Sequence, residues 1–307
     1  MKTFLFLGSR RGYAALKKFL QLKASICGIF CLKEDPHEEQ YHEKISALAK
    51  ENNIPIYFAP NLKPTEYSEI LKKCEAEIAF VIGWRFLIPK EAYTLPIKGT
   101  LIIHDSLLPK YRGFSPMSWA IINGEKETGV TLFFIAETVD SGAIVDQLKT
   151  PIYLEDTVFS LDQRLIQLYE KIIEKNFTAL QSGNFTTRIQ NEDEATFCCK
   201  RIPEDGLINW NQPAIKIYNF IRALSQPLPG AFTYLKGKKI FIWRASLPKT
   251  QLNYVGAIPG RVIGKINEKI QVVTENNIIC IEEVSIENTN KIMPAKEMII
   301  SVKDTFR

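Results

Sequence analysis

The feature that most constrains the fold is a regular alternation, along residues 1–189, of short apolar runs with longer segments of helical spacing. Runs of about five to eight mainly apolar residues predict strands, and apolar residues spaced i, i+3 and i+4 predict amphipathic helices between them. Strands that alternate with helices are typical of a mostly parallel sheet, so the pattern predicts an α/β domain. We expect strands at residues 3–7, 25–32, 55–58, 77–82, 99–104, 129–135 and 143–149, and helices at residues 13–22, 39–52, 64–74 and 157–183.

Three conspicuous segments directly follow predicted strands of this domain. They are Gly8–Gly12, Gly83–Phe86 and His104–Pro109. In open α/β sheets, ligands bind outside the carboxyl ends of the strands. We therefore expect a functional site where these three segments converge.

The pattern changes after residue 205. A helix predicted at residues 213–223 is followed by short strands at residues 231–235, 239–245, 260–266, 269–274 and 278–284, separated by turn residues. Short strands at this spacing are typical of a small β-barrel, here of OB-like type. The charged stretch 190–205 has little apolar periodicity, so we expect a first domain at 1–189, a linker at 190–205 and a second domain at 206–307.

The composition favours a cytoplasmic protein that handles small anionic molecules. The net charge is only +5, and the basic clusters are short and lack interleaved aromatic residues, which argues against nucleic acid. The six cysteines show no CxxC spacing and only three histidines are present, so we expect reduced thiols and no metal site. The first apolar run, which ends at Gly8, reads as a strand, and we expect no membrane span.

Two residues near the predicted site could perform acid–base chemistry. His104 ends a strand, and a histidine can gain or lose a proton near neutral pH. Asp140 lies in a turn between two strands and could orient the imidazole. Taken alone, His104 could be a hydrogen-bonded structural residue, and Asp140–Gly142 could be an ordinary type I turn. The two occur together with SLLP after the histidine and ETGVT before the aspartate, which favours a shared site.

These segments resemble a known family. LIIHDSLLPKYRG at 101–113, followed by SPMSWAIINGEKETGVTLF and VDSG at 139–142, is similar to the signature of the N10-formyltetrahydrofolate-dependent formyltransferases, of which methionyl-tRNA formyltransferase is one type. ATFCCKRIPEDGLINW and IRALSQPLPGAFTYLKGKKIFIWRA resemble the family's C-terminal module. The likeness is greatest to the enzymes that act on UDP-4-amino-4-deoxy-L-arabinose, and it runs from Met1 to about Ala245. It implies a Rossmann-like formyltransferase domain followed by the small barrel.

The resemblance also implies roles for individual residues. His104 would be the general base and acid with Asp140 as its partner, and N10-formyltetrahydrofolate would be the co-substrate. The segment Val81–Pro89 would wrap the pteridine, and the residues expected to bind it are Gly83, Trp84, Arg85, Phe86, Leu87, Ile88 and Val139. Trp84 and Phe86 could instead be buried at the end of a strand.

The acceptor side is expected at Arg10, Ser106, Leu108, Pro109, Tyr111, Arg112, Gly113, Ser115, Pro116 and Trp119. Arg112 is a candidate phosphate contact, since a planar guanidinium suits phosphate, although it could be a solvated surface residue. Arg10 and Arg11 lie in the loop after the first predicted strand, where the following helix N-terminus favours anions.

The sequence departs from the family pattern at one position. The family has an asparagine two residues before the histidine, and this chain has Ile102 there. Residues 102 and 104 of a strand share one face, so Ile102 should stand where an amide would donate to the formyl oxygen. Removing such a donor costs about 10² to 10³ in rate. The chain could be a slow or rewired formyltransferase, a protein that binds without efficient transfer, or an enzyme with a different acyl donor; we favour the first.

The acceptor is expected to be a nucleotide-linked amino sugar, as in lipopolysaccharide biosynthesis. Methionyl-tRNA formyltransferases usually carry a basic insertion after the second strand, whereas CLKEDPHEEQYHEK at 31–44 is short and acidic and would repel tRNA phosphates. A methionyl-tRNA formyltransferase, a formyl-folate hydrolase and a folate- or nucleotide-binding pseudoenzyme remain alternatives. A homodimer stays open.

Overall fold

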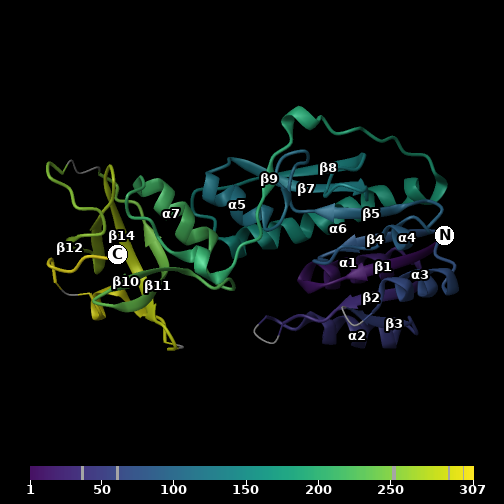
Figure 1. Cartoon of the computed structure of the whole chain (residues 1–307), viewed down its shortest axis with the longest axis horizontal. Coiled ribbons are helices and arrows are strands. Elements are labelled where there is room, and N and C mark those ends of the chain that lie inside the picture. Colours follow the sequence, from purple (N-terminus) through teal and green to yellow (C-terminus); the bar gives the residue numbers. More distant parts are fainter. Residues whose placement is uncertain (36–37, 60–61, 251–253, 290, 300) are drawn as a thin grey trace. The chain divides into compact units, whose positions relative to one another are not determined.

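The computed structural model describes residues 1–35, 38–59, 62–250, 254–289, 291–299 and 301–307. The chain forms two compact units, and each is discontinuous in sequence (Figure 1). The first comprises Met1–Gly113, Thr128–Thr150 and Gln163–Phe197, and the second comprises Phe114–Glu127, Pro151–Asp162 and Cys198–Arg307. Pro36 and His37, within the acidic stretch considered above, lie outside the described residues.

The first unit is built on a seven-stranded sheet with the order β3-β2-β1-β4-β5-β7-β8. The strands β3 to β5 in this order pair in parallel, and β7 runs antiparallel to β5. This confirms the predicted α/β class with a mostly parallel sheet. The strands are β1 (Lys2–Leu7), β2 (Ser25–Leu32), β3 (Ile56–Ala59), β4 (Ile78–Ile82), β5 (Thr100–His104), β7 (Glu127–Phe134) and β8 (Ile144–Pro151).

Helices pack on both faces of this sheet. Phe19 of α1 and Phe177 of α6 lie on the face of Phe80, whereas Tyr67 of α3 packs against Phe6 on the other face. The helices are α1 (Ser9–Gln21), α2 (Tyr41–Glu51), α3 (Pro64–Lys73), α4 (Lys90–Tyr93) and α6 (Val158–Ser182), and Figure 1 shows α1 and α6 alongside the strands.

A continuous row of apolar side chains crosses the sheet on the α3 face. Because the strands pair in register, the row is formed by Tyr57, Phe30, Phe6, Val81, Ile102 and Phe133. Ile102 packs against the core cluster that contains Phe6 and Val81, and also against the cluster of Leu108, Phe133 and Ile144. The isoleucine therefore extends the apolar core up to the position next to His104.

The start of α1 differs from the prediction. The helix begins at Ser9, where a later start at residue 13 was expected, because the Gly12 N–H already donates to Gly8 O at 2.9 Å. Arg10 and Arg11 consequently lie in the first turn of the helix and not in a loop. Apolar periodicity begins only at Tyr13, which is why the sequence placed the start too late.

The second unit contains two helices and an antiparallel sheet. Helices α5 (Pro116–Asn123) and α7 (Ala214–Ala223) pack against each other, and the sheet has the order β10-β11-β14-β13-β12, with β15 paired to β14. Closure into an OB-like barrel remains a prediction. The strands are β10 (Ala231–Leu235), β11 (Lys238–Ser246), β12 (Val262–Ile266), β13 (Lys269–Val273), β14 (Ile278–Ile286) and β15 (Met293–Pro294).

The stretch expected to be a linker contains short regular elements. Two 3-10 helices span Glu192–Glu194 and Pro203–Gly206, and the two-residue strand β9 (Phe197–Cys198) pairs with β6 (Arg112–Gly113). A third 3-10 helix spans Ala295–Glu297.

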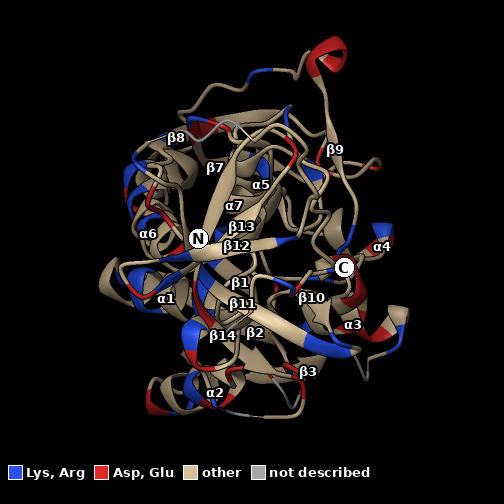
Figure 2. Cartoon of the chain, turned by 90° about the vertical axis from the view of Figure 1, so that its left-hand side faces the viewer, with Lys and Arg blue, Asp and Glu red and all other residues tan. Residues whose placement is uncertain are grey.

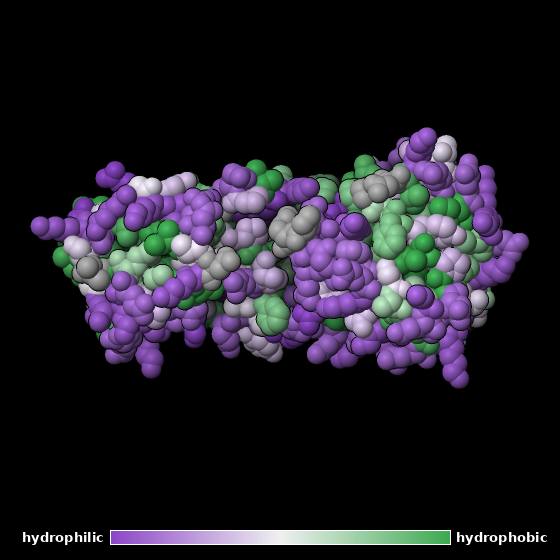
Figure 3. All heavy atoms as spheres, turned by 90° about the horizontal axis from the view of Figure 1, so that it is seen from below, coloured by the Kyte–Doolittle hydropathy of each residue, from purple (hydrophilic) through white to green (hydrophobic). Residues whose placement is uncertain are grey.

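Charged residues of both signs occur in the part of the chain that Figure 2 colours. Basic and acidic residues are interspersed along the ribbon in Figure 2, and the face shown in Figure 3 has apolar patches among hydrophilic residues. Within the described part of the chain, no helix is long and apolar enough to span a membrane.

Candidate active site

His104 is the last residue of β5 and lies at the carboxyl edge of the sheet. Its Nε2 is 2.9 Å from the carbonyl oxygen of Tyr111, and its Nδ1 is 3.7 Å from Oδ2 of Asp140. Because a carbonyl oxygen can only accept, Nε2 carries a proton in this arrangement, and Nδ1 is the nitrogen that can take up a second one. The His104–Asp140 distance is that of an ion pair and is longer than a hydrogen bond. Both side chains are largely buried, with 11% and 12% exposed.

Asp140 is held by the main chain around it. Its Oδ2 accepts from the Gly113 N–H at 2.8 Å, and its carbonyl oxygen accepts from Nε2 of Gln190 at 2.8 Å. Its own φ of 52° is in the left-handed region, which aspartate tolerates better than most residues. Gly142 lies so close to Phe134 that a Cβ there would collide with the Phe134 carbonyl oxygen. The Asp-Ser-Gly turn thus fixes the carboxylate beside His104.

The loop after His104 turns inward. Ser106 is buried, and its hydroxyl donates to Lys110 O at 2.7 Å, while Leu108 and Pro109 are also buried. Thr131 of β7 receives the Leu108 N–H at 3.1 Å and donates to Ser106 O at 2.6 Å. Ser106, Leu108 and Pro109 were predicted to contact the acceptor. In this structure Ser106, Leu108 and Pro109 shape the loop that carries Tyr111, and their side chains are not open to solvent.

Arg112 is not a free anion contact. The residue is only 2% exposed, and its guanidinium donates to Gln190 at 2.8 Å and to Glu192 at 2.7 and 2.8 Å. The same guanidinium holds the pKa of Glu192 below its ordinary value. The phosphate contact expected of Arg112 stays a prediction, and in this structure its guanidinium already binds the side chains of Gln190 and Glu192. Gly113 contributes its N–H to Asp140.

The segment predicted to hold the folate follows β4 and is partly open. Gly83 has a φ of 66°, and a Cβ there would collide with Gly8 O, so the loops after β1 and β4 approach closely. Leu87 is 89% exposed and Phe86 is 42% exposed, whereas Ile88 is buried. In contrast, Trp84 packs edge-on against Phe6 with ring centroids 5.5 Å apart. Among the residues that the structure describes, Trp84 Nε1 is buried without a hydrogen-bond partner.

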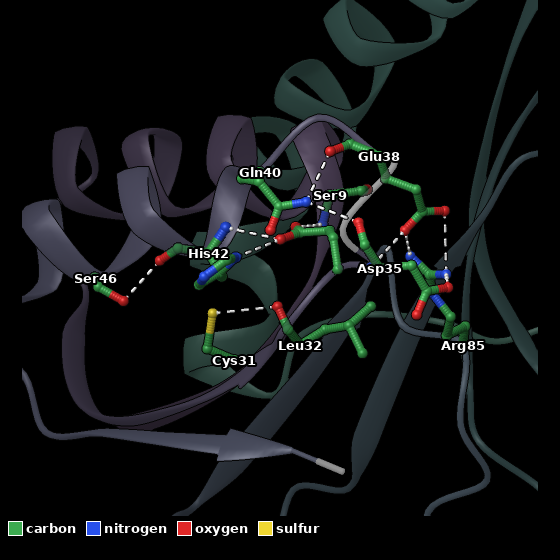
Figure 4. Close-up of polar contacts among 10 residues, drawn as sticks. Ser9, Cys31, Leu32, Asp35, Glu38, Gln40, His42, Ser46 and Arg85 are labelled. Carbon is green, nitrogen blue, oxygen red and sulfur yellow. Dashed lines mark hydrogen bonds and ion pairs between the residues drawn. The ribbon is translucent and has the colours of Figure 1, made fainter. Parts of the chain in front are cut away.

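Two charged residues of the predicted site are engaged elsewhere in the first unit. Arg85 contacts Glu38 at 2.6 Å and Asp35 at 3.6 Å, an arrangement that Figure 4 shows. Arg10 donates to Oε1 of Gln163 at 2.8 Å. Val139, at the start of the turn that holds Asp140, is 51% exposed.

The remaining acceptor-side residues belong to the second unit. Ser115 precedes α5 with a φ of 53°, and Pro116 is the first residue of that helix. Trp119 is partly buried; its indole N–H donates to Cys199 O at 3.0 Å, and the Arg201 guanidinium lies 4.9 Å from its ring centroid.

Sequence reasoning missed the residues that support the main chain at His104. Asp105 is bound by Arg11 and by Tyr169, and the side-chain amide of Gln190 donates to the carbonyl oxygen of Asp140. The one available signal was the charge of Asp105 directly after an apolar strand, which requires a partner if it is buried. In the described residues no group of three or more histidine, cysteine, aspartate or glutamate side chains is placed to hold a metal ion.

Two parts of the chain match known protein families. Residues 9–176 match the family described as formyl transferase, and residues 200–303 match the formyl transferase C-terminal domain. Together the two matches cover most of the chain.

Solved structures share the fold. HypX from Aquifex aeolicus in complex with tetrahydrofolic acid is 18% identical with a TM-score of 0.63, over 97% of this chain and 47% of that one, so the chain spans about half the length of HypX. WlaRD, a sugar 3N-formyl transferase crystallised in the presence of dTDP and 5-N-formyl-THF, is 21% identical with a TM-score of 0.67, over 94% and 98% of the two chains. The N-formyltransferase from Helicobacter canadensis, in complex with folinic acid and dTDP-3-aminofucose, has the same identity of 21% and TM-score of 0.67, over 92% and 98%.

Proposed function

The chain belongs to the formyltransferase family, and we propose that it transfers the formyl group of N10-formyltetrahydrofolate to the amine of a nucleotide-linked amino sugar. The observation that carries this proposal is the pair formed by His104 and Asp140, 3.7 Å apart at the carboxyl edge of the sheet. A largely buried histidine beside a fixed carboxylate is suited to accept and return a proton at neutral pH.

The proposed reaction needs one proton transfer in each direction. The acceptor amine attacks the formyl carbon, and the carbonyl electrons move onto oxygen. Collapse of this intermediate breaks the bond from the formyl carbon to N10. The amine proton passes to Nδ1 of His104 and from there to N10, while Asp140 stabilises the imidazolium between the two transfers. The products are an N-formyl sugar and tetrahydrofolate.

The segment after β4 supports a folate as the co-substrate. Its exposed Phe86 and Leu87 offer apolar surface to a pteridine ring, and the buried Trp84 N–H is a donor that a ligand's nitrogen or oxygen could satisfy. WlaRD and the Helicobacter canadensis enzyme were crystallised with formylated tetrahydrofolates, and HypX with tetrahydrofolic acid. The residues proposed to hold it are Gly83, Trp84, Arg85, Phe86, Leu87, Ile88 and Val139.

The side chain of Ile102 cannot stabilise the oxyanion, so we propose that His104 does so. Ile102 continues the apolar row of Val81 and Phe133 and has no donor. Once His104 has taken up a proton it carries a positive charge next to the reacting carbon, and such a charge can stabilise developing negative charge. We therefore expect a slow formyltransferase. A protein that binds folate and nucleotide without transfer, and an enzyme with another acyl donor, are the alternatives.

A nucleotide-linked amino sugar is favoured over tRNA as the acceptor. In the described part of the segment after β2, Glu34 is buried, Asp35 and Glu38 pair with Arg85, and Glu39 pairs with Lys44. The segment therefore offers no surplus of positive charge to the phosphates of a tRNA. WlaRD, a sugar 3N-formyl transferase crystallised in the presence of dTDP, and the N-formyltransferase from Helicobacter canadensis, in complex with dTDP-3-aminofucose, share this fold.

Turnover of the donor tests the proposal and separates its alternatives. The protein would be incubated with N10-formyltetrahydrofolate, with and without nucleotide amino sugars, and the release of tetrahydrofolate followed. Release that requires the acceptor supports a transferase. Release without any acceptor would instead indicate a formyl-folate hydrolase, and folate binding with no release in either case would indicate a pseudoenzyme. His104→Gln is the matched control, since it should lose release but keep the fold.

A further inference from the structure

Asp105, the residue directly after His104, is the centre of a network in the first unit. The guanidinium of Arg11 binds the carboxylate of Asp105 in a bidentate arrangement, with Nε 3.0 Å from Oδ1 and Nη2 2.8 Å from Oδ2. The hydroxyl of Tyr169 donates to the same carboxylate at 2.5 Å and also lies 3.1 Å from Ile103 O. Three elements, α1, β5 and α6, therefore meet at one carboxylate beside His104.

The network lies on the opposite face of the sheet from the imidazole. Ile102 and His104 point to the α3 face, so Asp105 points to the face that α1 and α6 cover. The side chains of Arg11 and Asp105 are each 17% exposed, and Tyr169 is 2% exposed. An ion pair this shielded from solvent, with a fork geometry, holds its shape better than a surface pair.

We propose that Arg11, Asp105 and Tyr169 position His104 and cancel the negative charge that Asp105 would otherwise place next to it; the catalytic part of this proposal rests on the proposed function. Arg11 and Tyr169 both bind the carboxylate of the residue after His104, and the Tyr169 hydroxyl oxygen also lies 3.1 Å from the carbonyl oxygen of the residue before it. The residue after the histidine is thereby fixed to two helices that pack on the sheet.

The charge on Asp105 affects how readily His104 can return its proton to the leaving nitrogen. His104 already faces one carboxylate, Asp140, and the Tyr111 carbonyl oxygen. An unpaired Asp105 would add a second negative charge close to the imidazolium and hold its proton more tightly. A base that keeps its proton cannot return it to the leaving nitrogen at neutral pH. Because Ile102 offers no oxyanion donor, the reaction depends all the more on how His104 is placed and charged.

The test measures the titration midpoint of His104 directly. The chain has three histidines, so side-chain NMR of the full-length protein, with His37→Gln and His42→Gln for assignment, can follow each one. In Arg11→Leu the midpoint should rise by about half to one pH unit, because Asp105 loses its cation. In Asp105→Asn it should fall, and in the double variant it should return to within about 0.2 unit of the wild type.

Two further variants, Tyr169→Phe and the control Lys18→Leu, are compared by kcat and by the titration midpoint of His104. Tyr169→Phe removes a hydroxyl without changing charge, so kcat should fall about 10-fold while the midpoint and KM stay as in the wild type. Lys18→Leu removes a cation from the same helix pair, 3.2 Å from Glu174, and should leave both readouts unchanged.

The outcomes separate this inference from the proposed function. A midpoint that moves by the same amount in the Lys18 and Arg11 variants, or does not move in either, overturns the charge-balancing role. An unchanged kcat in Tyr169→Phe overturns the positioning role. If the midpoints shift as expected but the wild type transfers no formyl group to any acceptor, the proposed function fails and the electrostatic part of the network stands.

Discussion

Replacing Ile102 by asparagine would test the weakest point of the proposed active site. The side chain lies in register between Val81 and Phe133, on the same face as His104. Asparagine would place an amide donor two residues before His104, where the formyltransferase family has one. Regaining a donor of this kind is worth up to about 10² to 10³ in rate, and imperfect placement should reduce the gain to about 10- to 100-fold.

The same substitution should destabilise the fold. Ile102 packs against two apolar clusters, so losing its buried surface costs about 1 to 2 kcal/mol, and an amide left partly unpaired costs about 1 to 3 kcal/mol more. A loss of about 3 kcal/mol corresponds to a melting temperature lower by about 6 to 12 °C for a unit of this size.

The assay is the initial rate of formyl transfer at saturating acceptor, measured below the melting temperature of the variant. Ile102→Leu is the control, because leucine has the shape of asparagine without the amide, and its rate should stay within about 2-fold of the wild type. A rate for Ile102→Asn at or below that of Ile102→Leu, with the fold intact by circular dichroism, would show that the oxyanion does not form beside residue 102.

Three further predictions follow from the same geometry. His104→Ala and Asp140→Ala should each lower transfer at least about 10²-fold without unfolding the protein, and retained transfer in either variant would remove that residue from the mechanism. Gly142→Ala should lower the melting temperature and the rate together, because its Cβ would collide with the opposite strand's carbonyl oxygen; an unchanged melting temperature would show that the turn relaxes freely. The pKa of Glu192 lies below its ordinary value of 4.5 because of Arg112, so this pairing stabilises the fold above about pH 4.5 and is lost as the pH falls further. Glu192→Gln should therefore lower the free energy of unfolding at neutral pH and flatten its acid dependence, and urea titrations that show parallel pH curves would contradict this.

The sequence predicted what is determined locally. Strand β5 ends at His104 as expected, and β2, α6 and β10 lie within one residue of their predicted bounds. These elements have strong periodicity and clear turn residues at their ends, which is the information that a short window of sequence contains. The turn at Asp140 could be predicted for the same reason, since Asp-Ser-Gly favours it.

The sequence could not predict contacts between distant segments. Arg112 was predicted to contact a phosphate, but its partners in this structure lie 78 and 80 residues later in the chain. The partners of Asp105 lie 94 residues before it and 64 after it. Neither pairing leaves a periodic signal, because the fold and not the local sequence brings the groups together.

Mass spectrometry of nucleotide-linked amino sugars, incubated with the protein and N10-formyltetrahydrofolate, tests the proposed formyl transfer most directly. A panel of UDP-, dTDP- and GDP-linked sugars would be compared, with the His104→Gln variant as the blank. If the protein is a nucleotide-sugar formyltransferase, at least one sugar gains the mass of a formyl group with the wild type and not with the blank. If folate binds but no sugar gains that mass, the claim of formyl transfer to a nucleotide sugar is contradicted.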